Sequence, residues 1–290
     1  MYKIKSRIRK LALSKVEGSP FIILLVMFLA SNFYSCQKVV SIDLNQASPQ
    51  IVIEGLVSDQ GVVDSVTVNM TGDYFTPTLN FPAVTGAVVV ISDNSGNADT
   101  LKETRGGFYA SSNPKGIPGN SYSLKVIANG NEYDAISTMP QKVNIDSFYV
   151  VKTNNPFGRE SSYDFYVVFQ DPPQQGNYYQ IVPHDNAIPL DSLNGEGGGI
   201  HIYDDEFING NEVSYRFRIA GKVEVGDTVS VDLLCIDKAT YEYLRTLRTA
   251  IETDRSPTSL APANPNTNLS NGSLGYFSAY TIDSKSLIIQ

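Results

Sequence analysis

The sequence contains no tryptophan and only two cysteines and two histidines in 290 residues. These shortages exclude an antibody-type immunoglobulin domain, which needs a cysteine pair beside a core tryptophan. They also exclude zinc sites made of several cysteines. The nucleophile elbow, the P-loop, the dinucleotide fingerprint and the H-E-x-x-H motif are missing as well. We therefore predict that the chain is not an enzyme and has no catalytic residues.

Long apolar runs are equally scarce, because the longest extends only from Phe21 to Ala30. It is well short of the roughly 20 residues that a membrane-spanning helix needs. Six basic residues and one acidic residue precede this run, and Cys36 follows shortly after it. This order is typical of a bacterial lipoprotein signal, which is removed before a cysteine that then receives acyl chains such as palmitate.

An ordinary secretory signal is the alternative for the same segment. Its cleavage site favours small residues, whereas bulky Phe33 and Tyr34 stand before Ser35 and Cys36. We therefore predict a lipoprotein signal at residues 1–35, lipidation of Cys36 and a tether at residues 36–49. The predicted location is the outer membrane. The sequence leaves two alternatives, attachment at the periplasmic face or at the cell surface.

The predicted mature chain is strongly acidic. Removing residues 1–35 takes away six of 22 basic residues and one of 30 acidic residues, which leaves 16 basic against 29 acidic residues and a net charge of −13. A surface of this charge argues against nucleic acid as a partner and against attachment to anionic lipid through a basic patch. Membrane attachment is therefore expected to depend on the acyl chains at Cys36.

The second cysteine, Cys235, has no partner left once Cys36 is acylated. It lies in the apolar run Val229–Ile236. We predict that it is a buried core residue and that the chain has no internal disulfide.

Short alternating segments separated by Gly, Asn, Asp and Pro predict an all-β fold. In residues 50–140 the expected strands indicate an immunoglobulin-like β-sandwich with an aliphatic and tyrosine-rich core. These strands are residues 50–58, 65–71, 87–92, 108–111, 121–128 and 132–138.

The alternation is interrupted near Met139 and Pro140, which predicts a second β-rich domain at residues 141–290. Its expected strands are residues 145–152, 163–170, 178–183, 213–220, 228–236, 274–281 and 286–289. One helix is predicted at about residues 238–252, because Asp237 can cap it and apolar residues recur at helical spacing. The loops at residues 194–199 and 255–272 are rich in Gly or in Ser, Pro and Asn and are candidate functional loops.

Candidate ligand-binding residues are few. Asp204, Asp205 and Glu206 are adjacent carboxylates that could bind calcium, with a solvated turn as the simpler alternative. Alternating polar residues from Asp93 to Asp99 resemble a calcium loop, yet the glycine falls at Gly96 and the twelfth position lacks glutamate. A hairpin turn is therefore predicted there.

A zinc site would need both histidines, His184 and His201, together with a carboxylate such as Asp204 or Asp205. Ordinary surface or loop histidines are the simpler interpretation, so no metal is predicted. Glycoside hydrolysis needs a pair of carboxylates, and a chain with this many acidic residues contains many possible pairs. The sequence singles out none of them.

Several segments in this order resemble the Bacteroidota outer-membrane lipoproteins classed as domain of unknown function 4249. The segments are VIEGLVSDQ (52–60), GAVVVISDNSG (86–96), PGNSYSLKVIANGNEYDAISTMP (118–140), IDSFYV (145–150), YEYLRTL (241–247) and NGSLGYFSAY (271–280). The resemblance implies an immunoglobulin-like domain followed by a second β-rich domain. It also implies a role beside a TonB-dependent transporter, in nutrient capture or transporter assembly, and supplies no catalytic residues.

The sequence thus favours a non-enzymatic lipoprotein that assists, or captures ligand for, a TonB-dependent transporter. A structural or adhesive surface protein and a carboxylate-based hydrolase remain as alternatives.

Overall fold

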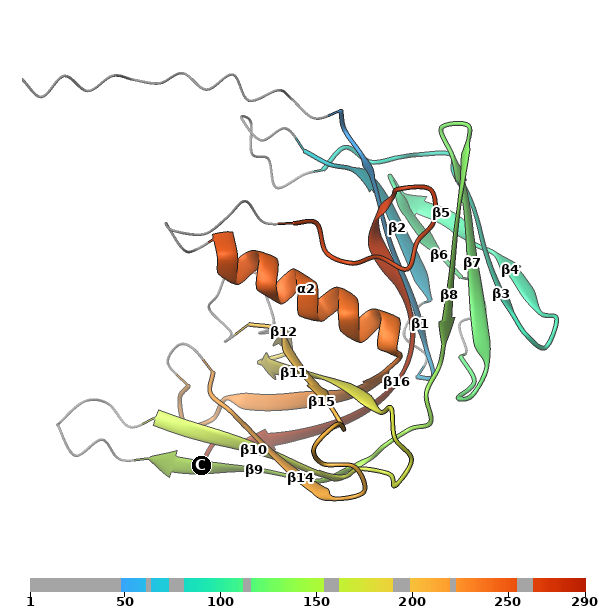
Figure 1. Cartoon of the computed structure of the whole chain (residues 1–290). Helices are drawn as coiled ribbons and strands as arrows, with labels where there is room; N and C mark the ends of the chain where they lie inside the picture. Colours follow the sequence, from blue (N-terminus) through green and yellow to red (C-terminus); the bar gives the residue numbers. More distant parts are fainter. Residues whose placement is uncertain are drawn as a thin grey trace, which may run out of the picture. The chain divides into compact units, whose positions relative to one another are not determined.

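A computed structural model of the chain describes residues 48–60, 64–72, 81–111, 116–153, 162–189, 199–219, 223–254 and 263–290 (Figure 1). These residues form β-strands and, within the described ranges, a single helix. The all-β prediction is therefore confirmed. Cys36 and the signal lie outside the described residues, as does the loop at residues 194–198.

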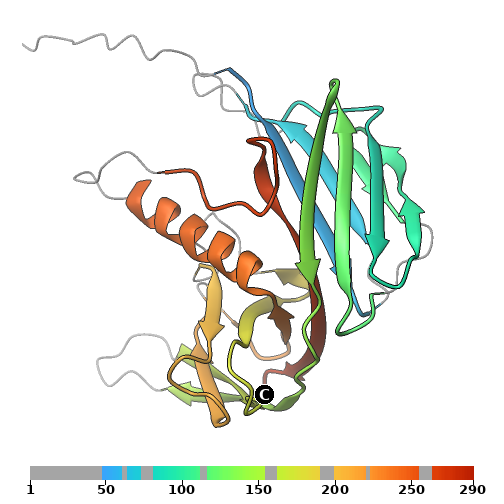
Figure 2. The same cartoon turned by 45° about the vertical axis from the view of Figure 1, so that its right-hand side comes forward.

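The first half of the chain forms a β-sandwich, seen at the right of Figure 2. One layer is part of a nine-stranded sheet and contains β1 (Ile51–Ser58), β2 (Ser65–Met70), β6 (Phe108–Ala110) and β5 (Lys102–Arg105). The other layer has the strand order β4 (Ala98–Thr100), β3 (Val88–Asp93), β7 (Ser121–Ala128) and β8 (Asn131–Thr138). Both layers contribute to one core, because alternate residues of β1 and β2 in one layer and of β3, β7 and β8 in the other face inward.

The alternation in β7 shows how the sequence produces this packing. Tyr122, Leu124, Val126 and Ala128 are buried, whereas the residues between them face solvent or the margin of the sheet. Side chains of a strand point alternately to its two faces, so a period of two places Tyr122, Leu124, Val126 and Ala128 in the core and leaves Ile127 on the exposed face.

The second half forms another sandwich. The continuation of the large sheet contains β16 (Leu274–Ile288), β15 (Thr228–Ile236) and β11 (Tyr178–Asp185), with β12 (Ile188–Pro189) and β13 (His201–Asp204) beside β11. It packs on a three-stranded sheet of β14 (Glu212–Phe217), β10 (Ser162–Gln170) and β9 (Ile145–Thr153). Aromatic side chains of β10 and β14 and aliphatic side chains of β15 meet between the two sheets.

Strand β16 belongs to both sandwiches (Figures 1 and 2). Residues 274–280 pair in parallel with β1, and residues 281–288 pair antiparallel with β15. The sequence predicts two strands here, because residues 282–285 are mostly polar. They stay in the sheet because each pairs with β15 and because the Asp283 carboxylate accepts the amide of Ile145 at 2.8 Å.

The shared strand also affects the predicted domain division at residue 140. Phe277 and Ala279 lie in the core of the first sandwich, although the sequence places them in the second domain. A parallel partner for β1 has to come from a distant part of the chain, which a division by sequence position does not anticipate.

Helix α2 (Lys238–Asp254) covers one face of the large sheet, and its position confirms the predicted helix. Asp237 caps it as predicted, because its Oδ1 accepts the Thr240 amide at 2.8 Å. Tyr243 and Leu244 are buried against the sheet, and the Tyr243 ring stacks on Tyr276 of β16 with centroids 4.4 Å apart. The helix therefore packs against β16, the strand that both sandwiches share.

Carboxylates hold the junction between the sandwiches. Asp59 accepts the Ile282 amide at 2.9 Å and pairs with Lys142 at 3.1 Å. Asp237 accepts the Ser137 hydroxyl at 2.7 Å, and Ser137 in turn accepts the Ala279 amide at 2.8 Å. These bonds join segments that are far apart in the sequence. They therefore fix the two sandwiches to one another.

The described part of the predicted loop at residues 255–272 begins at residue 263 and has a structural role. Asn268 exchanges two hydrogen bonds with the backbone of Phe277, at 2.7 and 3.0 Å. Ser270 exchanges two with the backbone of Asp134, at 2.8 Å each. This segment therefore bridges β8 and β16 and satisfies backbone groups at the edges of both sheets.

None of the helices in the described ranges has the length and apolar character to cross a membrane.

Candidate functional site

A cleft of about 470 Å³ opens at one end of the first sandwich. Residues from both sheets line it: Asp64, Ile91, Ser92, Asp93, Asn97, Ala98, Asp99, Leu101, Ser111, Ile117 and Tyr122. This volume lies in the range of small-molecule sites, and the lining combines an apolar floor with several polar groups, as such sites do. We therefore take the cleft as the candidate binding site.

The hairpin between β3 and β4 forms one wall of the cleft. Asp93 organises its turn, accepting the amides of Ser95 and Asn97 at 2.9 Å each and the Asn97 side-chain amide at 2.8 Å. These bonds, with that from the Asn97 side chain the largest, lower the pKa of Asp93 below its ordinary value. Asp93 is thus a fixed anion, and the predicted hairpin turn is confirmed.

The opposite wall comes from the chain around β2 and β6. Asp64, just before β2, accepts the Ser58 amide at 3.0 Å and is buried. Its carbonyl accepts the Ser111 amide, and the Ser111 hydroxyl donates to Asp99 Oδ2. Asp99 Oδ1 has no hydrogen-bond partner among the described residues. One carboxylate oxygen on the wall of the cleft is therefore left for a ligand.

Tyr122 lies at the floor and is only 5% exposed. Its hydroxyl oxygen accepts the Ile117 amide at 2.6 Å. Burial raises the pKa of Tyr122, and the charges of Asp93 and Asp64 raise it further. Since this bond is an accepted one, the hydroxyl proton is not donated to any described residue.

The predicted calcium cluster is divided among structural roles. The Asp205 carboxylate is buried and accepts the amides of Gly176 and Asn177 at 2.8 and 3.0 Å. Asp204 accepts the Tyr241 hydroxyl at 2.6 Å, and its other oxygen accepts the Glu206 amide at 3.3 Å. Asp205 is therefore a partner of a turn, and Asp204 is a partner of helix α2. Within the described ranges no group of carboxylates, histidines and cysteines is arranged to hold a metal ion.

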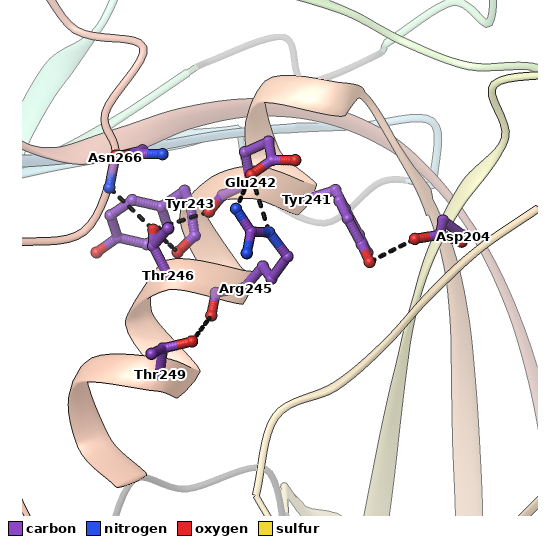
Figure 3. A network of polar contacts seen from close by, with 8 residues as sticks. All are labelled: Asp204, Tyr241, Glu242, Tyr243, Arg245, Thr246, Thr249 and Asn266. Atoms are coloured by element: carbon purple, nitrogen blue, oxygen red, sulfur yellow. Dashed lines mark hydrogen bonds and ion pairs between the residues drawn. The ribbon is translucent and has the colours of Figure 1, made fainter. Parts of the chain in front are cut away.

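Figure 3 shows the polar contacts that residues of α2 make within the helix and with Asp204 and Asn266. Thr246 bonds the carbonyls of its own helix and accepts the Asn266 amide at 2.9 Å, which fixes the bridging segment to the helix. Arg245 pairs with Glu242 at 2.6 Å on the outer side of the helix. Tyr241 reaches Asp204. Burial, with Asp204 as a second cause, raises the pKa of Tyr241 to about 12.

The two histidines lie on opposite faces of the large sheet. His201 is paired with Ile181, and its Nδ1 lies 2.9 Å from the Tyr215 hydroxyl between the two sheets of the second sandwich. His184 follows three residues after Ile181 on the same strand and therefore points to the other face, where it lies 3.5 Å from Asp232. A zinc site that uses both side chains does not fit this geometry.

Cys235 is buried, with 3% of its surface exposed, and is a free thiol as predicted. Burial raises its pKa, so the thiol is held in its unreactive protonated form.

A comparison with protein families confirms the domain of unknown function 4249. Residues 37–286 match the family described as Domain of unknown function (DUF4249). The chain belongs to this family. The family match begins directly after Cys36, so the predicted signal is not part of the DUF4249 domain. A comparison with curated proteins gives no match.

The cleft of this DUF4249 domain is not predicted by the sequence. The alternating polar residues from Asp93 to Asp99 predict the hairpin turn that forms its first wall, but not a binding site. Tyr122 and Ser111 gave no local signal, because they reach the cleft only through the pairing of distant strands.

Proposed function

We propose that the chain is a non-enzymatic outer-membrane lipoprotein that captures a ligand for, or otherwise assists, a TonB-dependent transporter. Acyl chains on Cys36 would hold it to the bilayer, and residues 37–49 would link the lipid to β1. The lipoprotein-type segment before Cys36, the family match from residue 37 onward and the β-sandwich fold support this proposal.

The observation that carries the proposal is the position of the cleft relative to Ile51, the residue at which β1 begins. The tether joins the amino-terminal end of β1 at Ile51, whereas Asp64 contacts the other end of β1 at Ser58 and lines the cleft. At about 3.3 Å per residue the strand separates the two points by roughly 23 Å. The cleft therefore lies at the end of β1 opposite to the end that follows the predicted tether in the sequence.

The side chains that offered other chemistry support a binding role. Cys235 is buried, Asp205 orders a turn and Asp204 bonds α2. Each of these groups contributes to the fold, whereas the cleft retains groups with hydrogen-bonding capacity to spare.

The test is affinity purification of the tagged full-length chain from solubilised outer membranes. A large transporter barrel should be recovered with it and should be lost when the chain carries Cys36→Ala and no longer reaches the membrane. Recovery of the lipoprotein alone in several detergents would contradict the partnership.

A structural or adhesive role is the second candidate, and one surface favours it. On the outer face of the β14–β10–β9 sheet, Tyr149 and Tyr166 stack with ring centroids 5.0 Å apart. Exposed Arg216 is the cross-strand neighbour of Tyr166. Tyrosine and arginine are enriched in protein interfaces. If this face serves adhesion, Tyr149→Ala with Arg216→Ala should abolish binding to cells or matrix while transporter recovery is unchanged.

A further inference from the structure

The cleft at the end of the first sandwich is chemically selective. Its floor is apolar, because Ile91 and Leu101 are core residues with exposed surfaces of 8% and 5%. Ile117 stands at its margin and is 52% exposed. A ligand with an apolar body can therefore replace water on the floor, with a gain of about 25 cal/mol per Å² of apolar surface that is buried.

The charged groups among the described residues of the same cleft are acidic. Asp93 and Asp99 lie on the hairpin wall and Asp64 on the wall opposite. No lysine or arginine stands among the described residues that line the cleft. Carboxylates in a concave site with low-dielectric walls focus their field on the interior, so the cleft is expected to attract cations.

Two groups in the cleft have hydrogen-bonding capacity that the described residues do not use. Asp99 Oδ1 accepts no bond. The buried Tyr122 hydroxyl accepts one bond, from the Ile117 amide, and has a proton left to donate. A ligand that donates a charge-assisted bond to Asp99 and accepts one from Tyr122 would satisfy both.

We infer that this cleft binds a small organic cation, in which an ammonium or guanidinium group pairs with Asp99 while an apolar body lies on Ile91 and Leu101. The inference rests on the ligand-capturing part of the proposed function and names its ligand class. Asp93 orders the hairpin and adds negative potential, whereas Asp99 provides the direct contact.

Three probes of the same shape separate charge from apolar contact: benzylamine, benzyl alcohol and benzoate. Binding of each to the full-length chain in detergent is measured by ligand-observed NMR at low ionic strength. Benzylamine should bind about tenfold more tightly than benzyl alcohol, as expected for one charge-assisted contact. Benzoate should not bind, and added salt should weaken benzylamine alone.

The matched variants are Asp99→Asn in the cleft and Asp134→Asn on exposed β8, which remove the same charge. Asp99→Asn should bring benzylamine to the affinity of benzyl alcohol, and Asp134→Asn should leave it unchanged. Equal losses in both variants, equal affinity for the three probes in the unsubstituted chain, or no saturable benzylamine binding would overturn the inference. If Asp99→Asn fails to fold, the comparison of the three probes on the unsubstituted chain still tests the inference.

The outcome of this test is separate from that of the proposed function. Absence of benzylamine binding with the transporter still recovered would reject the ligand class alone, whereas benzylamine binding without transporter recovery would reject the partnership alone.

Discussion

Ser137 and Asp237 are 100 residues apart in the sequence and are joined by a hydrogen bond of 2.7 Å. Ser137 is buried, with 1% of its surface exposed, and lies at the end of β8 in the first sandwich. Asp237 caps the helix that covers the large sheet. One carboxylate therefore starts α2 and links it to the first sandwich, so the helix and the junction are expected to be stabilised together.

The first prediction concerns this carboxylate. Asp237→Ala removes a helix cap, worth about 0.5–2 kcal/mol, and leaves the buried Ser137 hydroxyl without its acceptor, worth about 1–3 kcal/mol. We expect the free energy of unfolding in urea to fall by about 2–4 kcal/mol. Asp237→Asn keeps an acceptor oxygen for the cap and should lose less than half as much. Equal losses in the two variants would show that the hydrogen bonds do not carry the effect.

The second prediction concerns Gly275, where β16 pairs with β1. Its φ is +95°, and a Cβ at this position would lie 2.0 Å from the Ile53 carbonyl oxygen. Gly275→Ala should therefore cost about 4 kcal/mol or more, from backbone strain and from displacement of β1.

Gly176 is the matched control, because it has the same φ of +95° and no atom would lie within 4 Å of a Cβ added there. Gly176→Ala should cost only the strain, about 1–2 kcal/mol. If the two variants unfold at the same urea concentration, β16 and β1 do not approach each other as closely at Gly275 as the structure shows.

Much of the strand pattern followed from the sequence, because alternation in strands such as β7 reports directly on a two-layer core. The Asp237 cap and α2 were also predicted, since a cap and a helical apolar stripe are local signals. The continuous β16 was not predicted. Its polar middle is kept in the sheet by Asp283 and by β15, which are tertiary partners.

The bridging segment illustrates a second limit. Asn268 and Ser270 look like loop residues, and their strand-like role depends on β16 and β8 standing at the correct spacing. The cleft has the same origin, because Tyr122 and Asp64 converge only after distant strands pair. Single-residue patterns report local conformation and burial, and both of these features require contacts across the fold.

The third prediction uses the raised tyrosine pKa values. Burial raises the pKa of both Tyr241 and Tyr243 to about 12, compared with an ordinary value near 10. Because the folded state favours the protonated form, this stabilisation is fully present below about pH 10 and is lost as pH rises through 12. Unfolding free energy should therefore decrease between these pH values. Since the chain lacks tryptophan, tyrosinate absorbance reports these groups directly.

Tyr241→Phe provides the control for that titration. It removes the hydroxyl that donates to Asp204 and should remove one late-titrating group from the absorbance curve. An unchanged curve, with all tyrosines ionised by about pH 11, would contradict the assigned environment.

The fourth prediction concerns Cys235. Its burial and raised pKa should prevent reaction with a thiol reagent in the folded protein. Labelling should occur at the rate of unfolding and become independent of reagent concentration once the reagent is in excess. Rapid labelling under native conditions would mean that the core of the second sandwich opens locally.

The lipid tether at Cys36 is the claim on which the proposed function depends most. Cells that produce the full-length chain should be grown with labelled palmitate, and the purified chain should be examined for the label beside a Cys36→Ala variant. We predict that the label enters the unsubstituted chain and not the variant, and that only the unsubstituted chain fractionates with the outer membrane. Absence of label from the unsubstituted chain, together with full-length Cys36→Ala in the envelope fraction, would contradict the account.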